Sequence, residues 1–405
     1  MARDSGSGRN RHRVLIVGGG TAGITTAARL RRAGVTDIAL LDPTDTHWYQ
    51  PLWTLVGGGQ APLETTRRSE ASVMPKGVNW IREAATAVDP EAQTVTTSTG
   101  RTIGYDYLVM APGMQLDWGK VPGLEKTIGK NNVASNYSHE YAPHTWELIK
   151  KTRSGTAVFT QPAGMIKCGG APQKIAYLAC DYWRKQGVLD RIRVILVLPG
   201  DVMFGVPVWR RVLEKVAARY GIEVRFSSEM VAIDGPAGQV TIADRAAGTE
   251  ETLDYAMVHA VPPMSAPDWV KASPLSDGTP VGYISVDKHS LQHTRYKNVF
   301  ALGDAANLPT ARTGAAVRKQ APTVVANMMA EMKGQSRAPK SYDGYTSCPL
   351  VTARNKMLLA EFDYEPKPVP SMPFVNTTKE RTDMWVLKRY GLPALYWHGM
   401  LKGRV

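Results

Sequence analysis

The sequence predicts an α/β protein with two Rossmann-like units followed by a distinct C-terminal segment. A strand, a glycine turn, a helix and a second strand follow one another directly over residues 13–42. Two further apolar runs, 155–160 and 194–198, alternate with helical patterns in the middle third, as expected for a buried parallel sheet. Residues 384–402 break this alternation and mix Trp and Tyr with basic side chains.

The composition excludes several other classes of protein. A chain of 405 residues that is 43% hydrophobic and 21% charged can bury a core in each of two or three subdomains, so bulk disorder is excluded. Three cysteines are too few for a disulfide-stapled scaffold and favour a reducing compartment. No apolar run is long enough to span a bilayer, and no signal-peptide core follows Met1–Arg13. The net charge of +13 suits anions, nucleic acid or a membrane surface, but the basic residues are dispersed, so we expect no nucleic-acid partner.

The first unit carries a dinucleotide-binding pattern. Gly18, Gly20 and Gly23 fit G-x-G-x-x-G, which allows a tight turn, close approach of the backbone to a pyrophosphate, and close packing of helix on strand. Asp42 ends the second strand about 20 residues later, where a carboxylate can accept the ribose hydroxyls. The pattern predicts an adenine dinucleotide; the alternative is a glycine turn used only for packing.

A motif far downstream indicates which dinucleotide. The segment 294–305 is a turn, an apolar strand and then Gly303-Asp304, and it resembles the second flavin signature of flavoproteins with two dinucleotide domains. Residues 107–113 resemble the connection where the chain leaves the FAD domain in those proteins. These resemblances imply FAD as the cofactor and Asp304 as a contact to its ribityl chain.

The second unit lacks a second nucleotide fingerprint. Residues 155–160 and 194–198 are expected to be strands, and 172–185 and 209–220 helices. In pyridine-nucleotide reductases of this architecture the first of these strands opens a second G-x-G-x-x-G, whereas here the turn at 161–170 departs from it. NAD(P)H is therefore not expected as the electron donor.

The cysteines differ in their surroundings. Cys168 comes just before a helix, with Lys167 and Lys174 nearby, which should lower its pKa and make it nucleophilic. The alternative is the commoner role of free cysteine as a small buried hydrophobic residue. Cys348 lies in a loop-like segment, and its sequence distance cannot show whether it meets Cys168. Cys180 falls well inside the helix and is expected to be structural.

Three long runs resemble sulfide:quinone oxidoreductases, in particular the mitochondrial-type branch: 167–178, 342–352 and 360–364. The resemblance covers residues 12 to 400 and includes the shorter strings 136–138, 262–265 and 307–310. It implies the glutathione-reductase-like FAD/NAD(P) fold. The expected domains are an FAD-binding domain of 12–114 with 291–340, a second Rossmann-like domain of 115–290, and a C-terminal redox-cysteine and quinone segment of 341–405.

The resemblance also implies a reaction and its residues. FAD would oxidise hydrogen sulfide to sulfane sulfur through two cysteines and pass electrons to membrane quinone, while a small acceptor such as sulfite or a thiol takes the sulfur. A homo-oligomer and a peripheral location on the cytoplasmic side of the cell membrane are further expectations, and no metal is expected. The resemblance assigns the redox role to Cys168 and Cys348. It assigns FAD contacts to Gly20, Thr21, Asp42, Gln50, Ala85 and Asp304, and the motif glycines Gly18, Gly23 and Gly303 are expected to line the same site.

The C-terminal segment leaves two interpretations open. Its composition is typical of an interfacial segment with aromatic anchors, broken by Gly391 and Pro393 into two short helices. The alternative is a hairpin packed on the body of the protein. Two rival functions also remain at this point, a type II NADH:quinone dehydrogenase and a flavin-bearing sensor without turnover.

Overall fold

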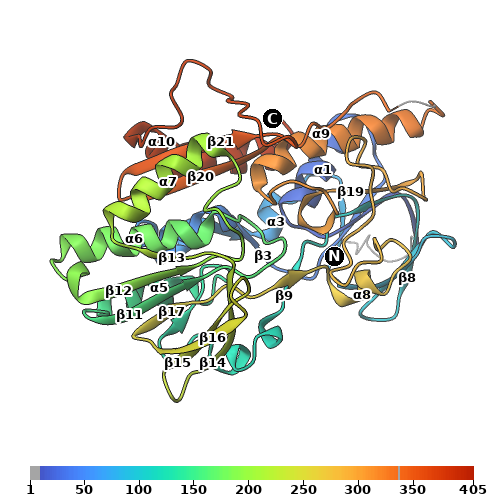
Figure 1. Ribbon diagram of the computed structural model, residues 1–405. Helices are drawn as coiled ribbons and strands as arrows, with labels where there is room; N and C mark the ends of the chain where they lie inside the picture. Colours follow the sequence, from blue (N-terminus) through green and yellow to red (C-terminus); the bar gives the residue numbers. More distant parts are fainter. Residues whose placement is uncertain (1–9, 336–337) are drawn as a thin grey trace, which may run out of the picture.

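The first unit is a seven-stranded sheet assembled from two distant parts of the chain. The computed structural model describes residues 10–335 and 338–405 (Figure 1). Six of the strands follow the order β5-β2-β1-β8-β7-β6, and the seventh, β19, pairs in parallel with the C-terminal part of β8. Its members are β1 (Arg11–Val17), β2 (Ile38–Leu41), β5 (Asn79–Ile81), β6 (Ala85–Asp89), β7 (Thr94–Thr97), β8 (Thr102–Met110) and β19 (Val299–Ala301). The return of β19 to β8 makes this unit discontinuous in sequence.

Two helices cover this sheet and meet each other. The expected first helix is α1 (Thr21–Arg32), which directly follows the glycine turn and packs against α9 (Gly314–Glu331). The parallel strands β1 and β2 are continuous apolar runs because helices and neighbouring elements bury both of their faces.

The second unit is a five-stranded parallel sheet of order β10-β17-β11-β12-β13. The expected strands and helices of the middle third are present with small shifts at their ends. Its elements are β10 (Val133–Ala134), α5 (Ala142–Lys151), β11 (Gly155–Thr160), α6 (Ala171–Lys185), β12 (Ile192–Val197), α7 (Pro207–Arg219), β13 (Glu223–Arg225) and β17 (Met257–His259).

Shorter elements complete both units. An antiparallel sheet of β14 (Ser228–Asp234), β15 (Gln239–Asp244) and β16 (Thr249–Asp254) extends the second unit. The others are β3 (Thr46–Trp48), β4 (Arg67–Ser69), β9 (Gln115–Leu116), β18 (Met264–Ser265), α2 (Trp53–Gly57), α3 (Glu70–Val73), α4 (Leu124–Thr127) and α8 (Asp268–Lys271).

The C-terminal part begins with a hairpin, which corrects one expectation. Cys348 lies in the strand β20 (Thr346–Ala353), paired with β21 (Lys356–Phe362), and not in a loop. A two-stranded ribbon tolerates Pro349 because each of its strands has a free edge. The strand β20 packs against α6, which brings the hairpin to the second unit (Figure 1).

The last segment is also more continuous than expected. Helix α10 (Thr382–Val386) runs through a π-helical turn at Leu387–Gly391 into α11 (Leu392–His398), so Gly391 and Pro393 do not separate two helices. Gly391 keeps right-handed helical dihedrals, and Pro393 occupies the first turn of α11, where a missing N–H is tolerated. Among the described residues, no helix is both long and apolar enough to cross a membrane.

Candidate active site

The glycine turn between β1 and α1 has the geometry of a pyrophosphate site. Gly18 has φ +103°, and a Cβ there would lie 2.2 Å from the Ala111 carbonyl oxygen. A Cβ on Gly23 would lie 1.8 Å from the Gly18 carbonyl oxygen, so helix and strand approach too closely for any side chain. Gly20 faces open space, with nothing within 4 Å of its Cβ position. The turn therefore leaves room for a phosphate at the N-terminus of α1.

Acceptors for a ribose lie beside this turn. Asp42 follows β2, and its carboxylate accepts hydrogen bonds from the Gly19 amide at 2.6 Å and the Thr44 amide at 2.8 Å. Glu70 is 1% exposed, and its Oε1 has no hydrogen-bond partner among the described residues. That oxygen lies 2.9 Å from the position of a Cβ on Gly19. A buried acceptor without a donor beside the glycine turn fits a cofactor that carries hydroxyl groups.

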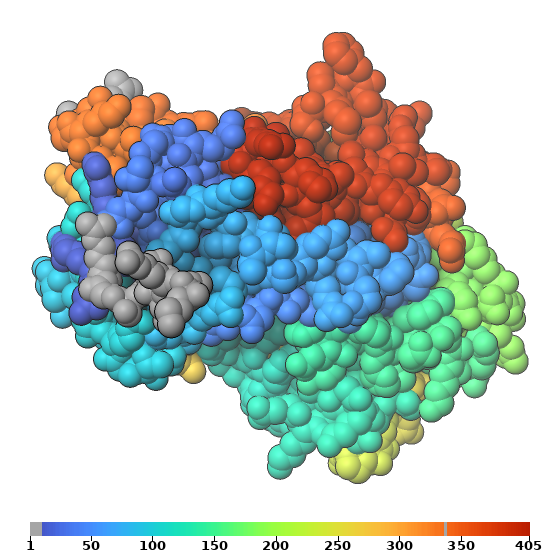
Figure 2. All heavy atoms as spheres, turned by 180° about the vertical axis from the view of Figure 1, so that it is seen from behind, coloured from blue at the N-terminus to red at the C-terminus, as the bar shows by residue number. Residues whose placement is uncertain are grey.

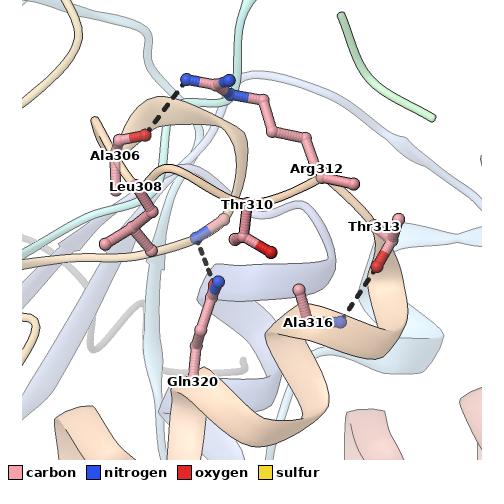
Figure 3. Close-up of a pocket in the computed structure, with 9 residues that line it drawn as sticks. Ala306, Leu308, Thr310, Arg312, Thr313, Ala316 and Gln320 are labelled. Carbon is pink, nitrogen blue, oxygen red and sulfur yellow. Dashed lines mark hydrogen bonds between the residues drawn. The ribbon is translucent and has the colours of Figure 1, made fainter. Parts of the chain in front are cut away.

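The Gly303-Asp304 motif meets the same turn. Gly303 has φ +73°, and a Cβ on it would lie 3.1 Å from the Ala22 Cβ in α1. Its amide donates to Gln320 Oε1 at 2.9 Å, at the edge of a pocket next to the start of α9 (Figure 3). Burial raises the pKa of Asp304. Its contact with a ribityl chain stays a prediction.

Lys167 and Cys168, in the connection before α6, lie near Gln50 and Asp304. Lys167 Nζ donates to Gln50 Oε1 at 2.8 Å and interacts electrostatically with Asp304. Cys168 is thereby connected, through Lys167, Gln50 and Asp304, to the glycine turn and the Gly303-Asp304 motif, which together we call the cofactor cradle. The last of the predicted contacts, Ala85, begins the edge strand β6, and its role stays a prediction.

Cys168 is held by hydrogen bonds in a left-handed conformation. Its φ is +51°, which is uncommon for a residue with a side chain. Its amide donates to the Arg312 carbonyl at 3.0 Å, and Tyr137 Oη donates to the Cys168 carbonyl at 3.1 Å. A conformation that is disfavoured in isolation is thus imposed by the surrounding structure, as often happens at functional sites.

The two predicted redox cysteines lie together. The thiol of Cys348 in β20 donates a hydrogen bond to Cys168, which lowers the pKa of Cys168 well below its usual value. The same bond raises the pKa of Cys348, and burial raises it further. Lys174 Nζ lies 3.0 Å from Cys168 Sγ and adds to the stabilisation of a thiolate there. Of this pair, Cys168 is therefore the sulfur that more readily carries a negative charge.

A second ammonium group faces the pair from the C-terminal segment. Lys388 is 2% exposed, and its Nζ donates to the Pro51 carbonyl at 3.0 Å. Burial and the neighbouring charge of Lys174 lower its pKa to about 7, while both cysteines act to raise it. Sequence reasoning missed Lys388, because a lysine among Trp and Tyr has the pattern of an interfacial residue. Nothing in the run 384–390, where Arg389 follows it directly, distinguishes Lys388 as a buried lysine.

The third cysteine lies apart from this chemistry. Cys180 is fully buried in α6, and burial raises its pKa. Cys348, by contrast, lines a pocket of about 330 Å³ together with Gly169 and Gly170 at the start of α6. A small molecule can therefore approach the pair from the Cys348 side.

Comparisons with known proteins place the chain in a family. Residues 12–331 match the family model described as "Pyridine nucleotide-disulphide oxidoreductase". The chain is 42% identical to the mitochondrial sulfide:quinone oxidoreductase of Dictyostelium discoideum, over 98% of this chain and 87% of that protein. It is 40% identical to the mouse protein of the same name, with the same two coverages.

A solved structure agrees at the level of the fold. The X-ray structure of the sulfide:quinone oxidoreductase from Aquifex aeolicus superposes with a TM-score of 0.79 at 21% identity, covering 96% of this chain and 91% of the other. The flavin-binding fold predicted from the sequence is confirmed, and the chain belongs to the sulfide:quinone oxidoreductase family, a group of FAD-binding oxidoreductases.

Proposed function

We propose that this protein oxidises hydrogen sulfide with FAD and a membrane quinone, and that Cys168 and Cys348 form its redox pair. The observation that carries the proposal is the meeting of these two thiols beside the FAD cradle, with Lys174 at 3.0 Å from Cys168 Sγ. A non-catalytic sensor would not need this cluster of two neighbouring thiols, one half-buried and one buried, with two buried lysines.

The sulfur step begins from the oxidised pair. Hydrosulfide attacks Sγ of Cys348, the sulfur–sulfur bond between the cysteines breaks, and a new bond forms between Cys348 and the incoming sulfur. Cys348 becomes a persulfide and Cys168 leaves as a thiolate. This direction is favoured because the thiol with the lower pKa is the better leaving group, and the pKa of Cys168 is the lowered one.

Two lysines support this charge distribution. Lys174 and Lys388 both act to lower the pKa of Cys168, so a negative charge released on that sulfur is met by ammonium groups already in place. Preorganised charge of this kind stabilises the product thiolate without rearrangement of the site.

The pocket at Cys348 offers a route for sulfide and for the sulfur acceptor. Gly169 and Gly170 line it at the N-terminus of the 15-residue helix α6, whose backbone dipole favours an approaching anion. Hydrosulfide, sulfite and thiolates are all small anions. We infer that sulfide enters through this pocket and that the persulfide sulfur leaves through it to a sulfite or thiol acceptor.

FAD fits the cradle described above, with Asp42 at the ribose, the glycine turn at the pyrophosphate and Asp304 at the ribityl chain. When bound, FAD would accept two electrons from Cys168 and pass them to quinone.

The quinone places the enzyme at a membrane surface. The C-terminal segment exposes Val386, Tyr390 and Leu395, at 46%, 58% and 36% of their surfaces. Apolar and aromatic side chains beside basic ones are typical of interfacial helices. The Dictyostelium and mouse relatives are named as mitochondrial. A quinone-bearing membrane is therefore the proposed site, its cytoplasmic side remains an expectation from sequence, and a homo-oligomer stays a prediction.

Replacement of single cysteines tests the proposal. In anaerobic stopped-flow measurements, Cys168→Ser and Cys348→Ser should retain bound FAD and lose sulfide-dependent flavin reduction by at least about a hundredfold, since neither can form the pair. Cys180→Ala is the matched control, because it removes the third thiol from the interior of α6 and should keep the wild-type rate. Full activity in either serine variant would contradict the redox pair.

A further inference from the structure

The end of the chain reaches the glycine turn of the first unit. Tyr396, in α11, is 2% exposed, and its Oη lies 2.9 Å from Thr21 Oγ1 and 2.5 Å from His47 Nε2. Thr21 is the first residue of α1, directly after the glycine turn. Figure 2 shows the C-terminal residues, in red, lying against the N-terminal region in blue. The C-terminal segment therefore contributes a side chain to the surroundings of the pyrophosphate site.

A buried polar chain supports Tyr396 from behind. His47 is 3% exposed, and its Nδ1 lies 3.1 Å from Glu70 Oε2. The other oxygen of Glu70 is the unpartnered acceptor beside Gly19. An unpaired buried acceptor is destabilising, so the hydrogen bonds of this group are complete only when a donor occupies the space at the turn. The chain of Tyr396, His47 and Glu70 thus runs from the C-terminal segment to the place where the cofactor ribose fits.

The rest of the segment packs along α1 and fixes the position of Tyr396. The Tyr49 ring lies 4.5 Å from that of Tyr396, and the Arg68 guanidinium lies 4.9 Å from the Trp397 ring. Further along, a Cβ on Gly403 would lie 2.9 Å from the Ala28 carbonyl carbon, so the chain passes directly over the backbone of α1. Close contact at both ends leaves the Tyr396 hydroxyl little freedom to move away from Thr21.

We propose that Tyr396 is a positioning residue for FAD, and that it makes the C-terminal segment a latch over the pyrophosphate. The hydroxyl orients the Thr21 side chain at the N-terminus of α1 and keeps α11 beside the glycine turn. The same segment carries Lys388 and the exposed side chains proposed to contact the membrane. Retention of FAD and the position of Lys388 therefore depend on one segment. The inference rests on FAD binding at the glycine turn and is independent of the sulfur chemistry.

Removal of one hydroxyl tests the latch. Apoprotein of Tyr396→Phe, titrated with FAD by fluorescence quenching, should bind FAD about tenfold more weakly than wild type and release it faster. Tyr220→Phe is the matched control, because Tyr220 is 4% exposed and its hydroxyl donates to the Thr352 carbonyl at 3.0 Å, between the second unit and the β20–β21 hairpin. This control should lose thermal stability without losing FAD affinity.

A second variant removes the hydrogen bond to Thr21 from the other side. Thr21→Val should weaken FAD binding as Tyr396→Phe does, and the double variant should lose much less than the product of the two single effects, because both remove the contact between Tyr396 and Thr21. Unchanged FAD affinity in Tyr396→Phe, or full additivity in the double variant, would overturn the latch. Sulfide oxidation by the wild-type protein would stand in either case, so failure of the latch is distinguishable from failure of the proposed function.

Discussion

The reactivity of Cys168 depends on single neighbouring side chains. Its pKa is lowered by the hydrogen bond from Cys348 and by Lys174, against the opposing effect of burial. The sequence predicted the contribution of Lys174 from its place in the first turns of a helix. The family resemblance pointed to Cys348, but the local sequence could not show that Cys348 or Lys388 lies beside Cys168, because both reach the site through tertiary packing.

Replacement of Lys174 tests this electrostatic account. Lys174→Met keeps the buried stem and removes the charge, so the pKa of Cys168 should rise. Thiolate alkylation in the reduced protein should then slow by about tenfold at neutral pH for each unit of pKa gained above that pH. Alkylation by iodoacetamide, located by peptide mass across a pH series, measures this directly. In wild type the rate at Cys168 should persist into acid, and in the variant it should fall as the pH drops through the raised pKa.

Two comparison variants separate charge from packing at this position. Lys174→Arg should preserve the low pKa of Cys168. Lys185→Met removes a lysine from the same helix, where its Nζ lies 2.7 Å from Asp181 Oδ2, and should leave alkylation unchanged. An alkylation profile that is identical in Lys174→Met and wild type would show that Lys174 does not stabilise the thiolate.

At the scale of elements, periodicity predicted the interior well and the C-terminal part less well. The strands β1, β11 and β12 each contain a buried apolar run, at 14–17, 157–159 and 194–197, so their sequence pattern is strong. Residues 342–351 contain Gly344 and Pro349, which are typical of loops, yet packing of β20 on α6 makes a strand of 346–353. A Cβ on Gly170 would lie 2.7 Å from Leu350 Cδ2, so a close helix–strand contact positions Cys348.

The C-terminal segment combines the two interpretations that its sequence left open. One face packs on the first unit through Tyr396 and Lys388, and the other exposes Val386, Tyr390 and Leu395. Deletion of 384–405 would therefore disturb the cofactor cradle and the redox lysine as well as any membrane contact. Point substitutions on the exposed face are the sharper test of membrane binding.

Two exposed side chains should control binding to membranes. Tyr390→Ser with Leu395→Ser should lower co-sedimentation with anionic vesicles by at least about tenfold, since burial of such side chains contributes about 1.5–3 kcal/mol each. Sulfide-dependent flavin reduction in solution should be unchanged. Val208→Ser with Phe226→Ser, which replaces exposed apolar side chains of the second unit, is the control and should keep wild-type partitioning. Equal partitioning of both double variants would exclude the C-terminal face as the membrane contact.

At the scale of the whole molecule, the connection at 161–170 distinguishes this protein from one that oxidises NADH. In the first unit α1 begins at Thr21, soon after β1 ends at Val17, and glycines line the connection. In the second unit residues 161–170 connect β11 to α6, and Cys168 lies in this connection. Cys168 thus lies in the connection that opens a second nucleotide fingerprint in pyridine-nucleotide reductases. The missing fingerprint was visible in the sequence, but the approach of the hairpin that brings Cys348 to the turn was not.

Anaerobic titration of the FAD-loaded protein with sulfide and, separately, with NADH tests the central claim most directly. The account predicts that sulfide bleaches the flavin absorbance in near-stoichiometric amounts, that a soluble quinone analogue restores it, and that NADH leaves the flavin oxidised. Bleaching by NADH with no response to sulfide would contradict the claim that a pair of thiols at this turn delivers the electrons.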